Sequence, residues 1–177
     1  MLKRAAETDP VRVSLFCGIA FALSFGPAYA QDQTAWSIYV QEDPTQCWVT
    51  SIPASTVATR GGEDVTDAIR RDEALLFISF WPADGRLAEV SYTGGYPFAN
   101  GSTVSLDVGG TTFELFTEGP MAWAGSPASD ARIIAALRSG SEVVVTAVSG
   151  RGTEVADTFS LTGFTAAIED AEVRCSN

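Results

Sequence analysis

The fold class follows from one stretch of sequence, Thr103-Val-Ser-Leu-Asp-Val-Gly-Gly-Thr-Thr-Phe-Glu-Leu115. Apolar and polar residues alternate on both sides of Gly109-Gly110, and a period of two is typical of a strand that places one face in a core. The two glycines supply the positive backbone φ angles that a tight two-residue turn requires. The stretch therefore predicts a β-hairpin.

Short apolar runs separated by turn residues fill most of the chain on either side of this hairpin. The runs predicted as strands cover residues 36–40, 47–52, 75–81, 87–92, 142–148 and 155–161. Residues 55–73 are polar and charged instead, and they predict a long loop with one helical turn near 66–71.

Two segments have helical rather than strand character. Ile133, Ile134 and Leu137 share one helical face after a cap at Ser129 or Asp130, and the helix should end at Gly140. A last short helix is expected over residues 163–170. Together the elements predict an all-β fold, a mostly antiparallel β-sandwich with one or two short α-helices.

The first 30 residues have the features of an export signal. A basic start is followed by an apolar run over residues 13–25 and by Ala28-Tyr29-Ala30, a small-x-small cleavage site. The run is shorter than the roughly 20 apolar residues that a spanning helix needs. We expect residues 1–30 to be a signal peptide and residues 31–177 to be one domain without a transmembrane segment.

The charge balance excludes some classes of partner. The chain has 11 Lys and Arg, 22 Asp and Glu and no His. Loss of residues 1–30 would remove three basic and two acidic residues, leaving eight arginines, no lysine, twenty carboxylates and a net charge of −12. Such an acidic protein should repel nucleic acid and anionic lipid surfaces.

The residue types also limit the chemistry. Without His there is no Ser-His or Cys-His relay, and three cysteines cannot form a four-thiolate zinc site. Adjacent carboxylates such as Glu63-Asp64 and Asp72-Glu73 could serve glycoside hydrolysis, but no spacing here shows two carboxyls facing a cleft. The segment 63–72 also lacks the specific D-x-D-x-D-G calcium pattern. We expect no catalytic residue, no cofactor and no metal site.

Two cysteines, Cys47 and Cys175, remain after loss of the signal. An even pair in an exported chain is most simply a disulfide, which would tie the start of the domain to its end. Two free thiols or a bond between two chains are the alternatives.

The C-terminal segment contains Ser149-Gly-Arg-Gly-Thr153, then Asp157-Thr-Phe-Ser-Leu-Thr-Gly-Phe164-Thr-Ala-Ala167, and then Cys175. It resembles the invasion-associated locus B family of exported bacterial proteins, whose members close with a similar run and a terminal Cys. The earlier pieces that are also similar are Gly95-Tyr96-Pro97, Cys47, Trp123 and the helix ending at Gly140. The resemblance implies a periplasmic, surface-associated or secreted β-rich domain, linked in pathogenic members to host-cell entry. It implies no enzymatic activity and no catalytic residues.

The Asp157 to Phe164 motif is expected to be a folding element. Asp157 shares a strand face with Phe159 and Leu161, so its carboxylate should point into the core with them. An inward carboxylate needs partners, and the nearest candidates are the backbone N–H groups of residues 149–153 or the guanidinium of Arg151. The competing hypothesis makes Asp157 a catalytic or ligand-binding carboxylate.

Three functions are compatible with these observations. The first is a non-enzymatic interaction protein, periplasmic or secreted, that binds a protein or envelope component through its loops. The second is a carboxylate-based hydrolase acting on an envelope glycan. The third is a carrier of a small apolar ligand.

Cleavage of the predicted signal peptide can be tested by mass spectrometry. We expect cleavage after Ala30, which leaves Gln31 at the N-terminus, because the Ala-x-Ala site follows an apolar run of signal length. The intact mass of the exported protein measures this. A mass that retains residues 1–30 would contradict it.

Overall fold

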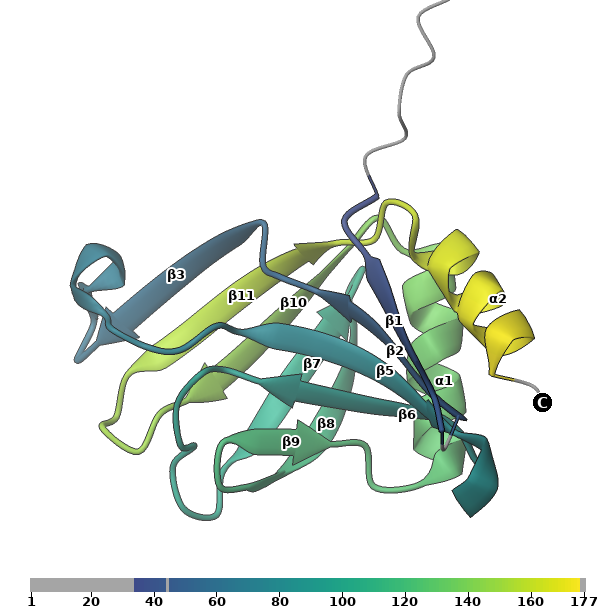
Figure 1. Ribbon diagram of the computed structural model, residues 1–177. Coiled ribbons are helices and arrows are strands. Elements are labelled where there is room, and N and C mark those ends of the chain that lie inside the picture. The colour runs from purple at the N-terminus through teal and green to yellow at the C-terminus, as the bar shows by residue number, and fades with distance from the viewer. Residues whose placement is uncertain (1–33, 44, 176–177) are drawn as a thin grey trace, which may run out of the picture. The chain divides into compact units, whose positions relative to one another are not determined.

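A computed structural model describes residues 34–43 and 45–175 of the chain (Figure 1). The signal peptide predicted over residues 1–30 lies outside these residues. The strands are β1 (Ser37–Glu42), β2 (Thr45–Ser51), β3 (Ser55–Arg60), β4 (Glu63–Asp64), β5 (Leu75–Trp81), β6 (Arg86–Thr93), β7 (Thr103–Val108), β8 (Thr111–Glu118), β9 (Met121–Trp123), β10 (Glu142–Val148) and β11 (Glu154–Ser160). The helices are α1 (Pro127–Ser139), α2 (Phe164–Arg174) and the short 3₁₀ turns η1 (Thr66–Ala68) and η2 (Pro82–Asp84).

The strands form one open sheet in the order β1-β2-β5-β6-β9-β8-β7-β10-β11-β3-β4. Every pairing between these strands is antiparallel. The predicted hairpin is present, since β7 pairs with β8 from Thr103↔Phe116 to Val108↔Thr111. The prediction of an all-β, mostly antiparallel fold with one or two short α-helices is confirmed, and the structure has two, α1 and α2.

The sheet curls strongly. Four strands separate β6 from β11 in the sheet order, so about 24 Å would lie between them if the sheet were flat. Yet the ring centroids of Tyr92 on β6 and Phe159 on β11 are 6.2 Å apart. One face of the curled sheet therefore encloses a continuous core that includes Leu76, Ile78 and Leu106, each with no exposed surface.

The helices and the disulfide cover one part of this sheet. Helix α1 packs on β6, and α2 packs on β1, β2 and β5. Cys175, directly after α2, is bonded to Cys47 on β2, with a Cα–Cα distance of 6.2 Å. The structure therefore contains the predicted disulfide, which ties residues 128 positions apart in the sequence.

Two local predictions were wrong. Residues 55–73 are not a long loop, because β3 pairs with β11 over Ser55–Arg60 and β4 extends the edge of the sheet. The helical turn predicted within this segment is present as η1. Helix α1 begins earlier than expected, because the side chain of Ser126 accepts a hydrogen bond from the Ser129 backbone N–H and caps it. Its end at Gly140 agrees with the prediction.

The disulfide gives a stability prediction. Replacing both cysteines, Cys47→Ser with Cys175→Ser, should lower the free energy of unfolding by about 2 to 5 kcal/mol, because the unfolded chain loses a long cross-link. Urea melts of the variant and of the wild type, each with and without reductant, measure this. The reduced wild type should resemble the variant. An unchanged midpoint in both comparisons would contradict the prediction.

Candidate functional site

The predicted motif centres on Asp157, in the middle of β11. Alternate residues of β11 are buried, so Val155, Asp157 and Phe159 all point into the core, and Asp157 has no exposed surface. Leu161 and Phe164, which follow, are also buried. The inward orientation of Asp157 therefore agrees with the sequence pattern.

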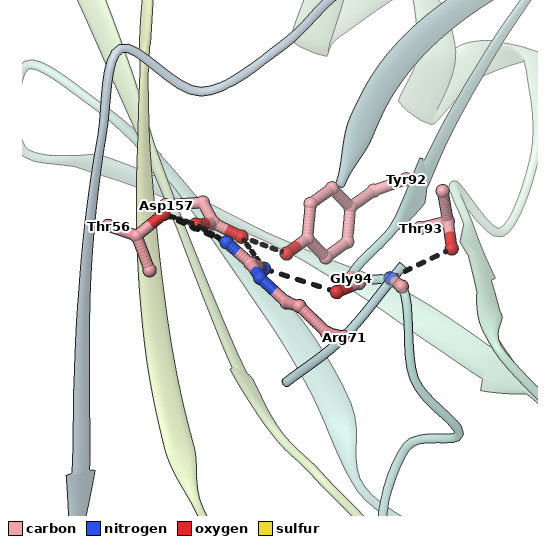
Figure 2. A network of polar contacts seen from close by, with 7 residues as sticks. Thr56, Arg71, Tyr92, Thr93, Gly94 and Asp157 are labelled. Atoms are coloured by element: carbon pink, nitrogen blue, oxygen red, sulfur yellow. Dashed lines mark hydrogen bonds and ion pairs between the residues drawn. The ribbon is translucent and has the colours of Figure 1, made fainter. Parts of the chain in front are cut away.

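The partners of this carboxylate differ from the expected ones. Arg71 binds it with both terminal nitrogens, each 2.6 Å from a carboxylate oxygen. The hydroxyl of Thr56 donates to Oδ1 at 2.5 Å and that of Tyr92 donates to Oδ2 at 2.7 Å. Figure 2 shows these side chains converging on Asp157. The expectation that Arg151 or the 149–153 backbone binds Asp157 was wrong, because Arg151 lies exposed on the β10–β11 turn.

The network connects four parts of the chain. Thr56 lies directly opposite Asp157 in the β3–β11 register, Tyr92 comes from β6, and Arg71 comes from the segment before β5. Arg71 also donates to the Thr56 hydroxyl and to the carbonyl oxygen of Gly94. The bidentate ion pair thus joins segments that are distant in the sequence.

Burial and charge shift the pKa values of Arg71, Tyr92 and the nearby Tyr96. The hydrogen bonds from Arg71 to Asp157 raise the pKa of the guanidinium. Burial, together with the Asp157 carboxylate, raises the pKa of the Tyr92 phenol far above its ordinary value, and raises the pKa of Tyr96 to about 12. Both phenols therefore keep their protons at neutral pH, and that of Tyr92 donates to the carboxylate.

This arrangement suits structure rather than catalysis. A carboxylate that accepts four hydrogen bonds and has no exposed surface has neither the free lone pair nor the access to substrate that a nucleophile or general base needs. Within the described residues, no group of three or more Cys, Asp or Glu side chains could hold a metal ion.

A pocket of about 720 Å³ adjoins the network. Its walls come from residues 68–72, the loop 95–97 and the β10–β11 turn, with Arg60 at the end of β3. Arg71 belongs to both features, since it lines the pocket and holds Asp157. Asp72 is the one acidic residue among the described residues that line the pocket. The pocket therefore lacks the pair of facing carboxylates that glycoside hydrolysis needs.

The pocket wall depends on close backbone contact. The backbone N–H of Asp72 donates to the carbonyl oxygen of Gly95 at 3.0 Å. Gly95 has a positive φ of 73°, and a β-carbon there would collide with the carbonyl of Asp72. Only glycine fits this position comfortably, and it holds the loop 95–97 against the segment that carries Arg70 and Arg71.

The fold and site define a disulfide-linked antiparallel β domain with a buried ion pair beside a pocket rich in arginine. The model of the invasion associated locus B (IalB) protein family matches residues 36–172. The chain therefore belongs to that family.

A solved structure has the same fold. The crystal structure of invasion associated protein B from Bartonella henselae matches with a TM-score of 0.55 and 17% sequence identity, covering 81% of this chain and 95% of that chain. No curated protein matches the sequence significantly. Two of the segments that resemble the family, residues 95–97 and 149–153, border the pocket.

The ion pair gives a second stability prediction. Asp157→Asn should lower the free energy of unfolding by about 3 to 5 kcal/mol, because it leaves the largely buried guanidinium of Arg71 without its counter-charge. Urea melts measure the loss. The control is Asp84→Asn, which breaks the exposed pair with Arg86 and should leave the midpoint nearly unchanged. A wild-type midpoint for Asp157→Asn, with loss of ligand binding, would instead support the functional hypothesis for this carboxylate.

Proposed function

We propose that this protein is an exported, non-enzymatic interaction protein of the bacterial envelope, which binds a protein or envelope component through the pocket beside the Asp157 network. Residues 1–30 direct export and are removed after Ala30, and residues 31–177 act as a single domain in the periplasm or outside the cell. The family supports a role in contact with a host or a surface, since its name and that of the Bartonella henselae protein both refer to invasion.

The pocket is the observation that carries this proposal. Loops and turns form most of its wall, and such segments on a rigid scaffold commonly bind partners. Its volume lies within the range of about 300 to 1,000 Å³ that is typical of ligand sites. The Cys47–Cys175 disulfide supports an oxidising compartment. Among the described residues, no helix has the length and hydrophobicity needed to cross a membrane.

The proposal can be tested by crosslinking in the native envelope. A photoreactive amino acid placed at Ala68, an exposed pocket residue, should capture a defined partner that mass spectrometry identifies. The same residue placed at Arg132 on α1 is the control and should not capture it. Release of soluble glycan fragments is assayed on the same preparation.

Two results would contradict the proposal. One is capture from Arg132 and not from Ala68, which would place the binding surface elsewhere. The other is glycan release by the purified protein above the buffer baseline, which would make the protein a hydrolase.

A further inference from the structure

The pocket has a charge opposite to that of the rest of the domain. Residues 31–177 contain eight arginines as their only basic side chains, against twenty carboxylates. Four of the eight line the pocket: Arg60, Arg70, Arg71 and Arg151. Half of the positive charge is therefore gathered at one site, where Asp72 is the one carboxylate among the described lining residues.

The pocket arginines also differ from most of the others in their partners. Of the four arginines outside the pocket, Arg86, Arg138 and Arg174 form ion pairs with carboxylates, and Arg132 forms none among the described residues. Among the described residues that line the pocket, Arg71 is the one arginine in an ion pair, and its partner is the internal Asp157. Within the described part of the chain, Arg60, Arg70 and Arg151 are exposed and have no ion pair. Three guanidinium groups thus remain open to a ligand.

Neutral hydrogen bonds hold two of these arginines in place. Arg60 donates from Nε and Nη2 to the hydroxyl of Thr153, at 2.9 and 2.6 Å. Arg70 donates from Nη1 to the carbonyl oxygens of Asp67 and Ile69. These contacts orient the side chains without neutralising their charge, so a ligand would meet groups that are already ordered.

The turn that carries Arg151 is fixed as well. The Ser149 N–H donates to the Thr153 carbonyl at 2.8 Å, and the Thr153 N–H donates to the Ser149 hydroxyl. The Gly150 N–H donates to the carbonyl of Pro97 at 2.9 Å, which joins this turn to the adjacent loop 95–97. The backbone positions of the pocket are therefore set before any ligand arrives.

We propose that this pocket is a binding site for a compact oxyanion, a small molecule or an exposed group that carries phosphate or carboxylate. The inference deepens the proposed function, because it rests on this pocket being the binding site and adds the chemistry of the ligand. Planar guanidinium groups match phosphate and carboxylate oxygens with paired, charge-assisted hydrogen bonds. The acidic remainder of the domain repels extended polyanions, so the ligand is one that fits within the pocket.

Isothermal titration calorimetry on the mature protein at low ionic strength tests this with two probes. Pyrophosphate represents phosphate, citrate represents carboxylate, and trehalose is the uncharged control. We expect saturable binding of at least one anion, weakened by added NaCl, and no binding of trehalose. The anion with the lower Kd identifies which oxyanion the pocket prefers.

Variants connect the binding to the pocket. Arg70→Gln and Arg151→Gln should each raise the Kd about tenfold or more, because each removes charge-assisted hydrogen bonds to the ligand. Arg132→Gln is the matched control, since Arg132 is also exposed and has no ion pair among the described residues but lies on α1. It should leave the Kd nearly unchanged. Asp72→Asn should lower the Kd, because it removes the carboxylate that opposes the anion.

Two outcomes would overturn the inference. One is the absence of saturable binding by both anions, and the other is equal weakening by Arg132→Gln and Arg151→Gln, which would mean that general charge attraction explains the binding. If a partner is nevertheless crosslinked at Ala68, the proposed function stands and only the oxyanion site is rejected.

Discussion

The burial of one carboxylate is the constraint on which this fold depends. Removing Asp157 from water costs several kcal/mol unless its oxygens find donors. The donors are Thr56 on the neighbouring strand β3, and Arg71 and Tyr92, which reach Asp157 only because the sheet curls. A flat sheet would separate Asp157 from Arg71 and Tyr92, leaving the carboxylate with Thr56 alone and without a counter-charge. The network therefore penalises wrong arrangements more than it stabilises the correct one.

The same interaction positions the pocket. Because Arg71 is held inward by Asp157, its neighbours Arg70 and Asp72 lie at the surface beside the loop 95–97. The helices and the disulfide close the core elsewhere, over β1, β2, β5 and β6. Figure 1 shows η1 and the β10–β11 turn at the ends of the strands away from both helices. The segment that carries Arg70 and Arg71 is therefore anchored by a buried charge pair, and backbone hydrogen bonds hold the loop 95–97 and the β10–β11 turn beside it.

The sequence predicted what depends on local pattern and missed what depends on pairing across the sheet. Alternation identified the 103–115 hairpin and the inward side of Asp157, and the count of cysteines identified the disulfide. The strand β3 was missed, because its residues are polar and its stability comes from pairing with β11. The role of Arg71 as the partner of Asp157 was also missed. A signal existed, since an arginine is the one cationic partner available to an inward carboxylate in a domain without lysine or histidine, but proximity in sequence favoured Arg151 and the 149–153 backbone.

The adjacent residues Arg70 and Arg71 have different roles, and the topology of the fold rather than the local sequence sets this difference. Nothing in the local sequence separates Arg70 from Arg71, yet Arg71 enters the core while Arg70 stays exposed and hydrogen-bonded to carbonyl groups. The twenty carboxylates of the domain provide ion-pair partners for three of the four arginines outside the pocket, Arg86, Arg138 and Arg174. Arg60, Arg70 and Arg151 instead surround a cavity in which Asp72 is the single carboxylate among the described lining residues. Concentrating like charges there is unfavourable in the empty domain, because the guanidinium groups repel one another. An anion that enters the pocket relieves this repulsion, so the arrangement is consistent with selection for binding rather than for stability alone.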